Sequence, residues 1–114
     1  MPRRDARFRI EDMRDAVARI LTYAAGLSFD EFAADQKTVD AVVRNFEVLG
    51  EAARHVDDAT QRLAPGIPWL EVRDMRNLLA HEYFGVDLET LWKTVADDLP
   101  DLLLQVEELL RKLP

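Results

Sequence analysis

Apolar residues along the chain recur at intervals of three and four, the spacing that places them on one face of an α-helix. Strict alternation of apolar and polar residues, which would indicate a strand, is nowhere sustained. The pattern predicts four principal helices, at about residues 5–25, 36–56, 68–84, and a long last segment that begins after Asp87. Because the connections between them are short, we expect an all-α, antiparallel up-and-down bundle.

Helix-breaking and helix-capping residues fix the expected boundaries. Gly26 should end the first helix, and Ser28 with Glu31 forms a capping box that predicts a short helical turn. Pro68 is suited to the first position of the third helix, which should end at Gly85. Pro100 lacks an N–H group and should kink or divide the last helix.

The periodic apolar residues also predict which side chains are buried. The expected core consists of Ile10, Met13, Val17, Ile20, Leu21 and Ala24 from the first helix, Val39, Val42, Val43, Phe46, Leu49, Ala53 and Val56 from the second, and Leu88, Leu91, Val95, Leu99, Leu102, Leu103, Val106, Leu109 and Leu110 from the last. A chain of 114 residues with 48% hydrophobic content can form one such core. We therefore expect a single domain over residues 1–114.

Composition and charge narrow the function classes. The chain has no cysteine, no signal-like N-terminus and no apolar run near 18 residues, so we expect a soluble, cytoplasmic protein that does not span a membrane. Its net charge of -7 disfavours broad binding to nucleic-acid backbones. The charge is unevenly distributed, however. Residues 1–25 contain six arginines and four acidic residues, whereas residues 82–114 contain eight acidic and three basic residues.

Several familiar sites are excluded or disfavoured. The four glycines are scattered, which excludes the usual phosphate-binding loops, and the one serine, Ser28, is expected to act as a cap. Glu51 and His55 share a helix face, but an ion pair exposed to solvent is the better interpretation than a metal site. No cofactor is expected.

The stretch RNLLAHEYF, residues 76–84, places polar side chains on an otherwise apolar helix. Asn77 and His81 are four residues apart and share a face, whereas Arg76 lies about 140° around the helix from His81. Arg76 must therefore reach around, or its partner must come from another chain. A histidine that moves protons and an arginine that stabilises phosphate charge suffice for RNA cleavage, because RNA supplies its own 2′-hydroxyl nucleophile. The alternative is a structural role for both residues.

The stretch MRNLLAHEYF, residues 75–84, contains Arg-x4-His-x-Tyr and resembles the signature of the HepT-like family of HEPN-domain proteins. Four further stretches are similar to that family in its usual order. They are LTYAAGLSFDEF (21–32), TVDAVVRNFEVLGEAA (38–53), IPWLEVRDMRNLLAHEYFGVD (67–87) and DLPDL (98–102). The resemblance thus covers almost the whole chain.

The resemblance implies an α-helical HEPN bundle that forms a homodimer, with two Arg-x4-His motifs facing each other across a cleft. It implies a metal-independent endoribonuclease toxin of a toxin-antitoxin pair, in which Arg76 stabilises the transition state, His81 is the general acid or base, and Asn77 orients or binds phosphate. Its partner would be an MntA-like nucleotidyltransferase antitoxin that transfers AMP to Tyr83. Seven residues separate Tyr83 from Arg76, so the added anion would lie on nearly the same helix face.

Two other functions stay open at this point. The first is a non-catalytic HEPN module that binds a nucleotidyltransferase or presents its substrate, with Arg76 and His81 used for packing or recognition. The second is a plain structural bundle. Arg76, His81 and Tyr83 together favour the ribonuclease, because a scaffold has no need of all three. Arg73 and Arg44 could add positive potential around such a cleft.

Overall fold

The computed structural model describes the backbone of residues 5–82 and 87–114, and the side chains of residues 5–75 and 87–114. Within these ranges the chain forms helices and turns, with no strand. The predicted all-α class is therefore confirmed. No helix in the described ranges is long and apolar enough to cross a membrane.

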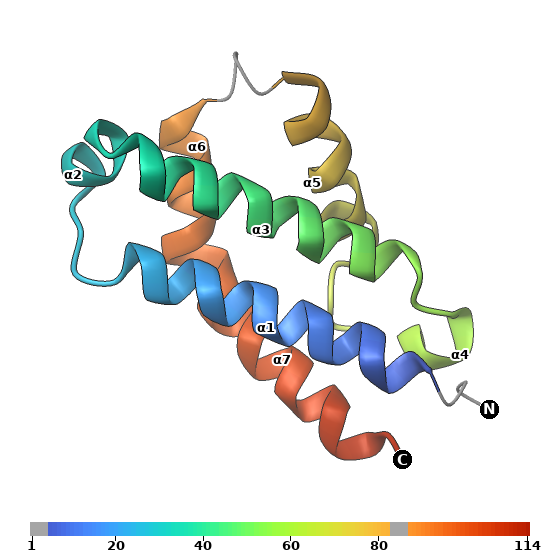
Figure 1. Cartoon of the computed structure of the whole chain (residues 1–114). Coiled ribbons are helices and arrows are strands. Elements are labelled where there is room, and N and C mark those ends of the chain that lie inside the picture. Colours follow the sequence, from blue (N-terminus) through green and yellow to red (C-terminus); the bar gives the residue numbers. More distant parts are fainter. Residues whose placement is uncertain (1–4, 83–86) are drawn as a thin grey trace.

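The helices follow the predicted order, with additional short segments. They are α1 (Ala6–Ala24), α2 (Phe29–Ala34), α3 (Gln36–Arg54), α4 (Asp58–Gln61), α5 (Trp69–Glu82), α6 (Leu88–Lys93), the π-helical η2 (Thr94–Asp98) and α7 (Leu99–Lys112). The long helices α1, α3 and α5, and the run from α6 to α7, correspond to the four predicted helices (Figure 1).

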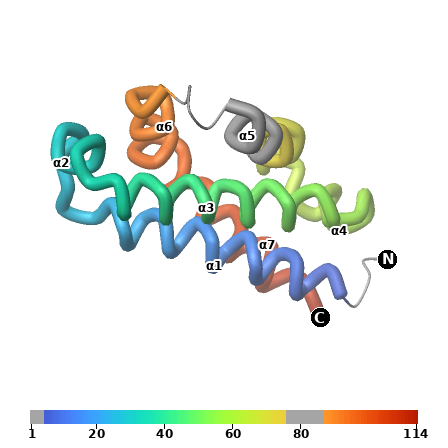
Figure 2. Tube along the Cα trace, turned by 45° about the horizontal axis from the view of Figure 1, so that its top comes forward, coloured from blue at the N-terminus to red at the C-terminus, as the bar shows by residue number. Residues whose placement is uncertain are grey.

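The long helices pack in a simple spatial order. α3 runs back alongside α1, and α5 packs on the other side of α3 (Figures 1 and 2). α7 packs against α1, while α2 contacts both α3 and α6. The helix that carries the arginine-histidine motif therefore lies at one side of the bundle, with α3 as its main neighbour.

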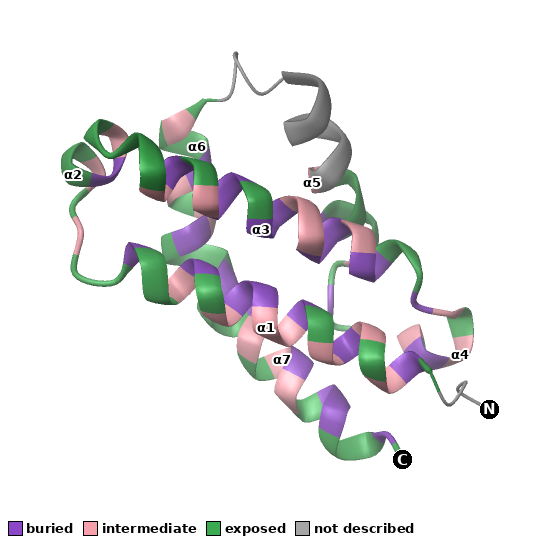
Figure 3. Cartoon of the chain, in the orientation of Figure 1, coloured by how far each residue is buried: buried purple, intermediate pink, exposed green. Residues whose placement is uncertain are grey.

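The core lies between α1, α3 and α7. The largest side chains with less than 2% exposure are Ile10, Met13 and Ile20 of α1, Phe32 of α2, Phe46 and Leu49 of α3, and Leu99 and Leu109 of α7. The purple segments of Figure 3 follow these inward faces. Most of the predicted core is confirmed, but Leu21, Leu88 and Leu103 are only partly buried at its edge. The ring of Phe32 also contacts that of Trp92, with centroids 4.9 Å apart, and so joins α2 to α6.

The predicted helix ends around α1 and α2 are confirmed. Gly26 has φ = +77°, the left-handed conformation that favours glycine after a helix. The Ser28 hydroxyl accepts from the Glu31 N–H at 3.1 Å, and the Glu31 carboxylate accepts from the Ser28 N–H at 2.9 Å. These reciprocal bonds form the expected capping box.

Two local features differ from the sequence prediction, and a third predicted feature is not tested. The segment before Pro68 contains the short helix α4, which Asp57 caps by accepting from the Thr60 N–H at 3.1 Å. Pro68 itself precedes α5, which begins at Trp69. The predicted end of this helix at Gly85 lies outside the described residues.

Pro100 divides the last helix, as predicted, although the irregular turn precedes the proline. The Leu99 N–H donates to the carbonyl oxygen of Thr94, a π-helical bond across five residues. Pro100 then occupies the first turn of α7, where its missing N–H has no intrahelical partner to lose. The wider turn of η2 therefore lets the chain stay helical on both sides of the proline.

Candidate active site

α5 begins at a well-anchored position. The indole N–H of Trp69 donates to the carbonyl oxygen of Ala64 at 3.0 Å, and the buried Ile67 secures the loop between them. Glu71 lies in the first turn, where its negative charge complements the helix dipole. These contacts fix the position and rotation of the helix at its start.

α7 holds the same loop from the other side. The Gln105 amide donates to the carbonyl oxygen of Gly66 at 3.0 Å, and the Lys112 ammonium donates to that of Leu63 at 3.1 Å. Both bonds join residues far apart in the sequence. The last helix therefore helps to place the helix that carries the motif.

The two faces of α5 differ sharply in exposure. Val72 is 3% exposed and faces the core, whereas Leu70 is 57% exposed. Trp69 and Met75 are partly buried against the core, and Arg73 and Asp74 are exposed. The described half of α5 thus has one inward and one outward face.

Arg76, Asn77 and His81 lie on α5 by their backbones, and their side chains lie outside the described residues, as does Tyr83 altogether. At about 100° per residue, position 76 lies about 40° from Val72 around the helix, whereas position 81 lies about 180° from it. Position 77 lies about 140° from Val72. The register therefore places Asn77 and His81 along the face of Leu70, and Arg76 near the edge of the inward face.

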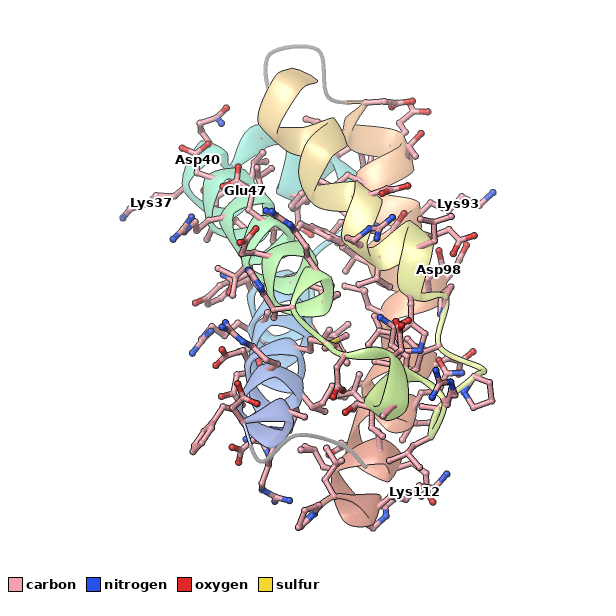
Figure 4. All side chains as sticks on the ribbon, turned by 90° about the vertical axis from the view of Figure 1, so that its right-hand side faces the viewer. Lys37, Asp40, Glu47, Lys93, Asp98 and Lys112 are labelled. Carbon is pink, nitrogen blue, oxygen red and sulfur yellow. The ribbon has the colours of Figure 1, made fainter. Side chains whose placement is uncertain are left out.

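The surface around α5 carries paired charges. Figure 4 shows Glu47 of α3 to one side of this helix, and Lys93 and Asp98 to the other. Arg73 lies 3.6 Å from the Asp74 carboxylate, and Arg44 lies 3.5 Å from that of Glu47. Because an acid accompanies each arginine, neither residue adds net positive charge to its immediate surroundings.

α6 begins directly after the segment that contains Tyr83. The Asp87 carboxylate accepts from the Thr90 hydroxyl at 2.8 Å and from the Glu89 N–H at 3.0 Å. These bonds stabilise the charged carboxylate, so the pKa of Asp87 is lowered, chiefly by the Thr90 hydroxyl. Asp87 thus caps the N-terminus of α6, four residues after Tyr83 in the sequence.

Glu51 and His55 contact each other as predicted, with 3.0 Å between Oε1 and Nε2. Arg54 also approaches Glu51, at 3.7 Å. No group of three or more metal-binding side chains is found in the part of the chain that the structure describes. Glu51 and His55 thus contact each other on the exposed surface of the bundle.

A hollow of about 290 Å³ between α1 and α3 was not predicted from the sequence. It is lined by Arg9 and Asp12 of α1 and by Arg44, Glu47, Val48, Glu51 and Ala52 of α3. The sequence contained one indication of it, because the polar residues Arg44, Glu47 and Glu51 recur at helical spacing on α3. Because the charges of the lining are mixed, the hollow by itself selects no class of ligand.

Comparisons with known proteins converge on one family. A sequence model described as "Ribonuclease HepT-like" matches residues 13–109, which include all of α5. A protein of Thermococcus cleftensis named "Probable ribonuclease HepT" is 42% identical over 100 residues, covering 88% of this chain and 91% of that protein.

More distant relatives extend the match. One protein of Methanocaldococcus jannaschii, named as a candidate RNase, is 32% identical over 111 residues, covering 97% of this chain and 92% of its own length. Another named in the same way, from Caldanaerobacter subterraneus subsp. tengcongensis, is 38% identical over 87 residues, covering 76% of this chain and 78% of its own. No solved structure matches.

Proposed function

Because this chain belongs to the HepT-like ribonuclease family, we propose that it is a metal-independent endoribonuclease and the toxin of a HepT/MntA-type toxin-antitoxin pair. The observation that carries the proposal is the family match over residues 13–109, which contains Arg76, Asn77 and His81 within one continuous helix. Its place of action would be the cytoplasm, where RNA substrates are found.

The proposed chemistry uses the RNA 2′-hydroxyl as the nucleophile. His81 removes the proton from this hydroxyl, and the oxygen attacks the adjacent phosphorus. The bond to the 5′-oxygen breaks, and a protonated His81 returns a proton to that leaving oxygen. The products are a 2′,3′-cyclic phosphate end and a 5′-hydroxyl end, so protons and bonds balance without a metal or a covalent intermediate.

Arg76 and Asn77 would act on charge and position. The guanidinium of Arg76 stabilises the negative charge that grows on the non-bridging phosphate oxygens in the transition state. The amide of Asn77, which shares a face with His81, orients the imidazole or the phosphate. These roles require the arginine to meet a histidine on a different helix face.

A homodimer would bring Arg76 and His81 together. Positions 76 and 81 are separated by about 140° around α5, so they lie on different faces of one helix. Across a two-fold axis, the Arg76 of one copy can approach the His81 of the other. The site would then be built from both chains.

Tyr83 is the proposed off-switch. An MntA-like nucleotidyltransferase would transfer AMP from ATP to the Tyr83 hydroxyl, forming an oxygen–phosphorus bond and releasing pyrophosphate. The added group carries negative charge and bulk close to the motif, where it would repel and obstruct RNA.

Cleavage of RNA by the purified chain tests the proposed function. Arg76→Ala should abolish cleavage, whereas Arg111→Ala, a change of an exposed arginine on α7, should leave it nearly unchanged. If the wild-type chain binds a nucleotidyltransferase but never cleaves RNA, the non-catalytic HEPN module is the better account.

A further inference from the structure

The outer surface of α1 carries a hollow that the proposed function does not use. It has a volume of about 300 Å³ and is lined by Asp15, Ala18, Arg19, Thr22 and Tyr23. These positions lie within about 140° of one another around the helix, and the buried residues of α1 lie on the opposite side. The hollow therefore faces away from the core.

The side chains of this hollow suit a nucleotide. Tyr23 is 40% exposed, and the exposed Arg19 precedes it by four residues, so both lie on one helix face. Surfaces that bind single-stranded nucleic acid combine aromatic rings, on which bases stack, with cationic groups that contact phosphates. Thr22 adds an exposed hydroxyl, which can donate to a phosphate oxygen. The hollow therefore offers one group for the base and two for the phosphate.

The charge around the hollow favours an anion. The Arg14 guanidinium lies 3.0 Å from the Asp15 carboxylate, which is therefore already paired. Among the residues that the structure describes, Arg19 forms no ion pair. The hollow between α1 and α3 differs, because three carboxylates and two arginines line it. Of the two hollows, the one on the outer surface of α1 is thus the better site for a phosphate.

Stacking also suits the acidic charge of this chain. The net charge of -7 opposes binding to RNA phosphates, and Arg73 and Arg44 each lie beside a carboxylate. Stacking between a base and an aromatic ring does not depend on net charge and accepts any base. An exposed tyrosine can therefore hold RNA where the attraction for phosphates is weak.

We infer that Arg19, Thr22 and Tyr23 form an anchoring site for single-stranded RNA, in which a base stacks on Tyr23 and Arg19 contacts a phosphate. α3 lies between α1 and α5, so this site is separate from the motif (Figures 1 and 2). The anchoring site holds the strand and takes no part in the cleavage chemistry. The inference rests on the proposed function for the identity of the substrate, but RNA binding and RNA cleavage can be measured apart.

Binding of a fluorescent single-stranded oligouridine to the full chain tests the base contact. His81→Ala serves as the background, so that the RNA stays intact. Tyr23→Leu should weaken binding about fivefold or more, the effect of losing one stacked base, whereas Tyr23→Phe keeps the ring and should bind nearly as tightly as the background. Phe8→Leu is the matched control, because Phe8 is also exposed on α1 but lies about 22 Å away along the helix. Equal binding by Tyr23→Leu and the background, or an equal loss in Phe8→Leu, would overturn the inference.

The salt dependence of the same binding tests the phosphate contact. Arg19→Gln should reduce the slope of log affinity against log salt concentration by about 0.7, the value for one phosphate contact on a single strand. Arg111→Gln, which changes an exposed arginine of α7 that contacts Glu108, should leave the slope unchanged. An unchanged slope in Arg19→Gln would contradict the contact between Arg19 and phosphate.

Photocross-linking locates the bound RNA without relying on a loss of binding. An oligouridine that contains iodouridine should form a covalent bond with the ring on which the modified base stacks. Peptide mass spectrometry should then find the RNA attached to Tyr23. Cross-links confined to other residues would contradict the anchoring site.

Kinetics separate this inference from the proposed function. In the wild-type background, Tyr23→Leu should raise KM for a long single-stranded RNA about fivefold or more and leave kcat unchanged. Cleavage of a dinucleotide should not change, because a dinucleotide at the motif does not reach α1. Cleavage with an unchanged KM for long RNA would overturn the anchoring site alone. RNA binding that depends on Tyr23, in a chain that never cleaves RNA, would contradict the proposed function alone. If Tyr23→Leu binds RNA normally but loses the nucleotidyltransferase, the hollow belongs to that protein.

Discussion

The side-chain amide of Gln105 on α7 donates a 3.0 Å hydrogen bond to the carbonyl oxygen of Gly66, 39 residues earlier in the chain. Gly66 lies in the loop that leads into α5, where the Trp69 indole also bonds to Ala64. The C-terminal helix thereby constrains the start of the helix that carries Arg76 and His81.

Removing this bond should loosen the loop without disrupting the core. Gln105→Ala should lower the free energy of unfolding by about 0.5 kcal/mol, because the bond is exposed and its groups can bond to water when it is lost. Urea unfolding measures the change. Leu104→Ala, on the same helix and exposed, is the control and should change stability less. Equal effects of the two variants would mean that the bond adds nothing.

The cap of α6 predicts a pH dependence of stability. Hydrogen bonds from Thr90 lower the pKa of Asp87, so its carboxylate stabilises the fold above its ordinary pKa near 4. This contribution is lost as the pH falls through the lowered pKa. Asp87→Asn keeps a capping side chain but removes the charge. The difference in stability between wild type and Asp87→Asn should therefore shrink between neutral pH and about pH 2. A constant difference would exclude the carboxylate charge as its source.

The proposed off-switch predicts a site-specific mass change. The chain has two tyrosines, Tyr83 and the 40% exposed Tyr23 of α1. Incubation with ATP and the partner nucleotidyltransferase should add AMP to the wild type and to Tyr23→Phe. Tyr83→Phe should stay unmodified and remain active against RNA. Peptide mass spectrometry that finds AMP on Tyr23 would refute the assignment.

A site shared between two chains predicts recovery of activity from two inactive variants. Arg76→Ala and His81→Ala homodimers should each be inactive. After subunit exchange, the mixture should regain about a quarter of the wild-type activity, because about half of the dimers are mixed and each keeps one intact pair. RNA cleavage before and after mixing provides the measurement. A mixture that stays inactive despite confirmed exchange would place both groups of a working site in one chain.

Much of the fold follows from local rules that are visible in the sequence. The capping box of Ser28 and Glu31 and the stop at Gly26 depend only on neighbouring residues, and both form as predicted. The buried stripe of α3 follows its apolar period, including Val42, Phe46 and Leu49. Such features need no knowledge of the other helices.

Features that depend on distant contacts could not be predicted in this way. Helix α4 is only four residues long, too short to show a periodic apolar pattern. The π-helical turn before Pro100 and the bonds from Gln105 and Lys112 to the loop before α5 require the packed bundle. The hollow between α1 and α3 likewise arises only when two helices meet.

The residues of the candidate site could be predicted from the motif, but the pairing of the charged side chains around it could not. Helical spacing assigns Arg76 and His81 to different faces of α5, and the family resemblance gave the motif its proposed roles. The pairing of Arg73 with Asp74 and of Arg44 with Glu47 depends on side-chain positions, which spacing alone leaves open. In the structure, each of these two arginines lies beside a carboxylate.

The account depends most directly on proton transfer by His81, and metal-free RNA cleavage tests it. Purified wild type, His81→Ala and His55→Ala should be compared on labelled RNA in EDTA. The exposed His55, which follows the last residue of α3 and contacts Glu51, is the matched control. Wild type and His55→Ala should cleave and leave 2′,3′-cyclic phosphate ends. His81→Ala should remain folded and lose at least a hundredfold in rate, the lower range for general acid–base catalysis. Cleavage that stops on chelation, or that persists in His81→Ala, would contradict the proposed mechanism.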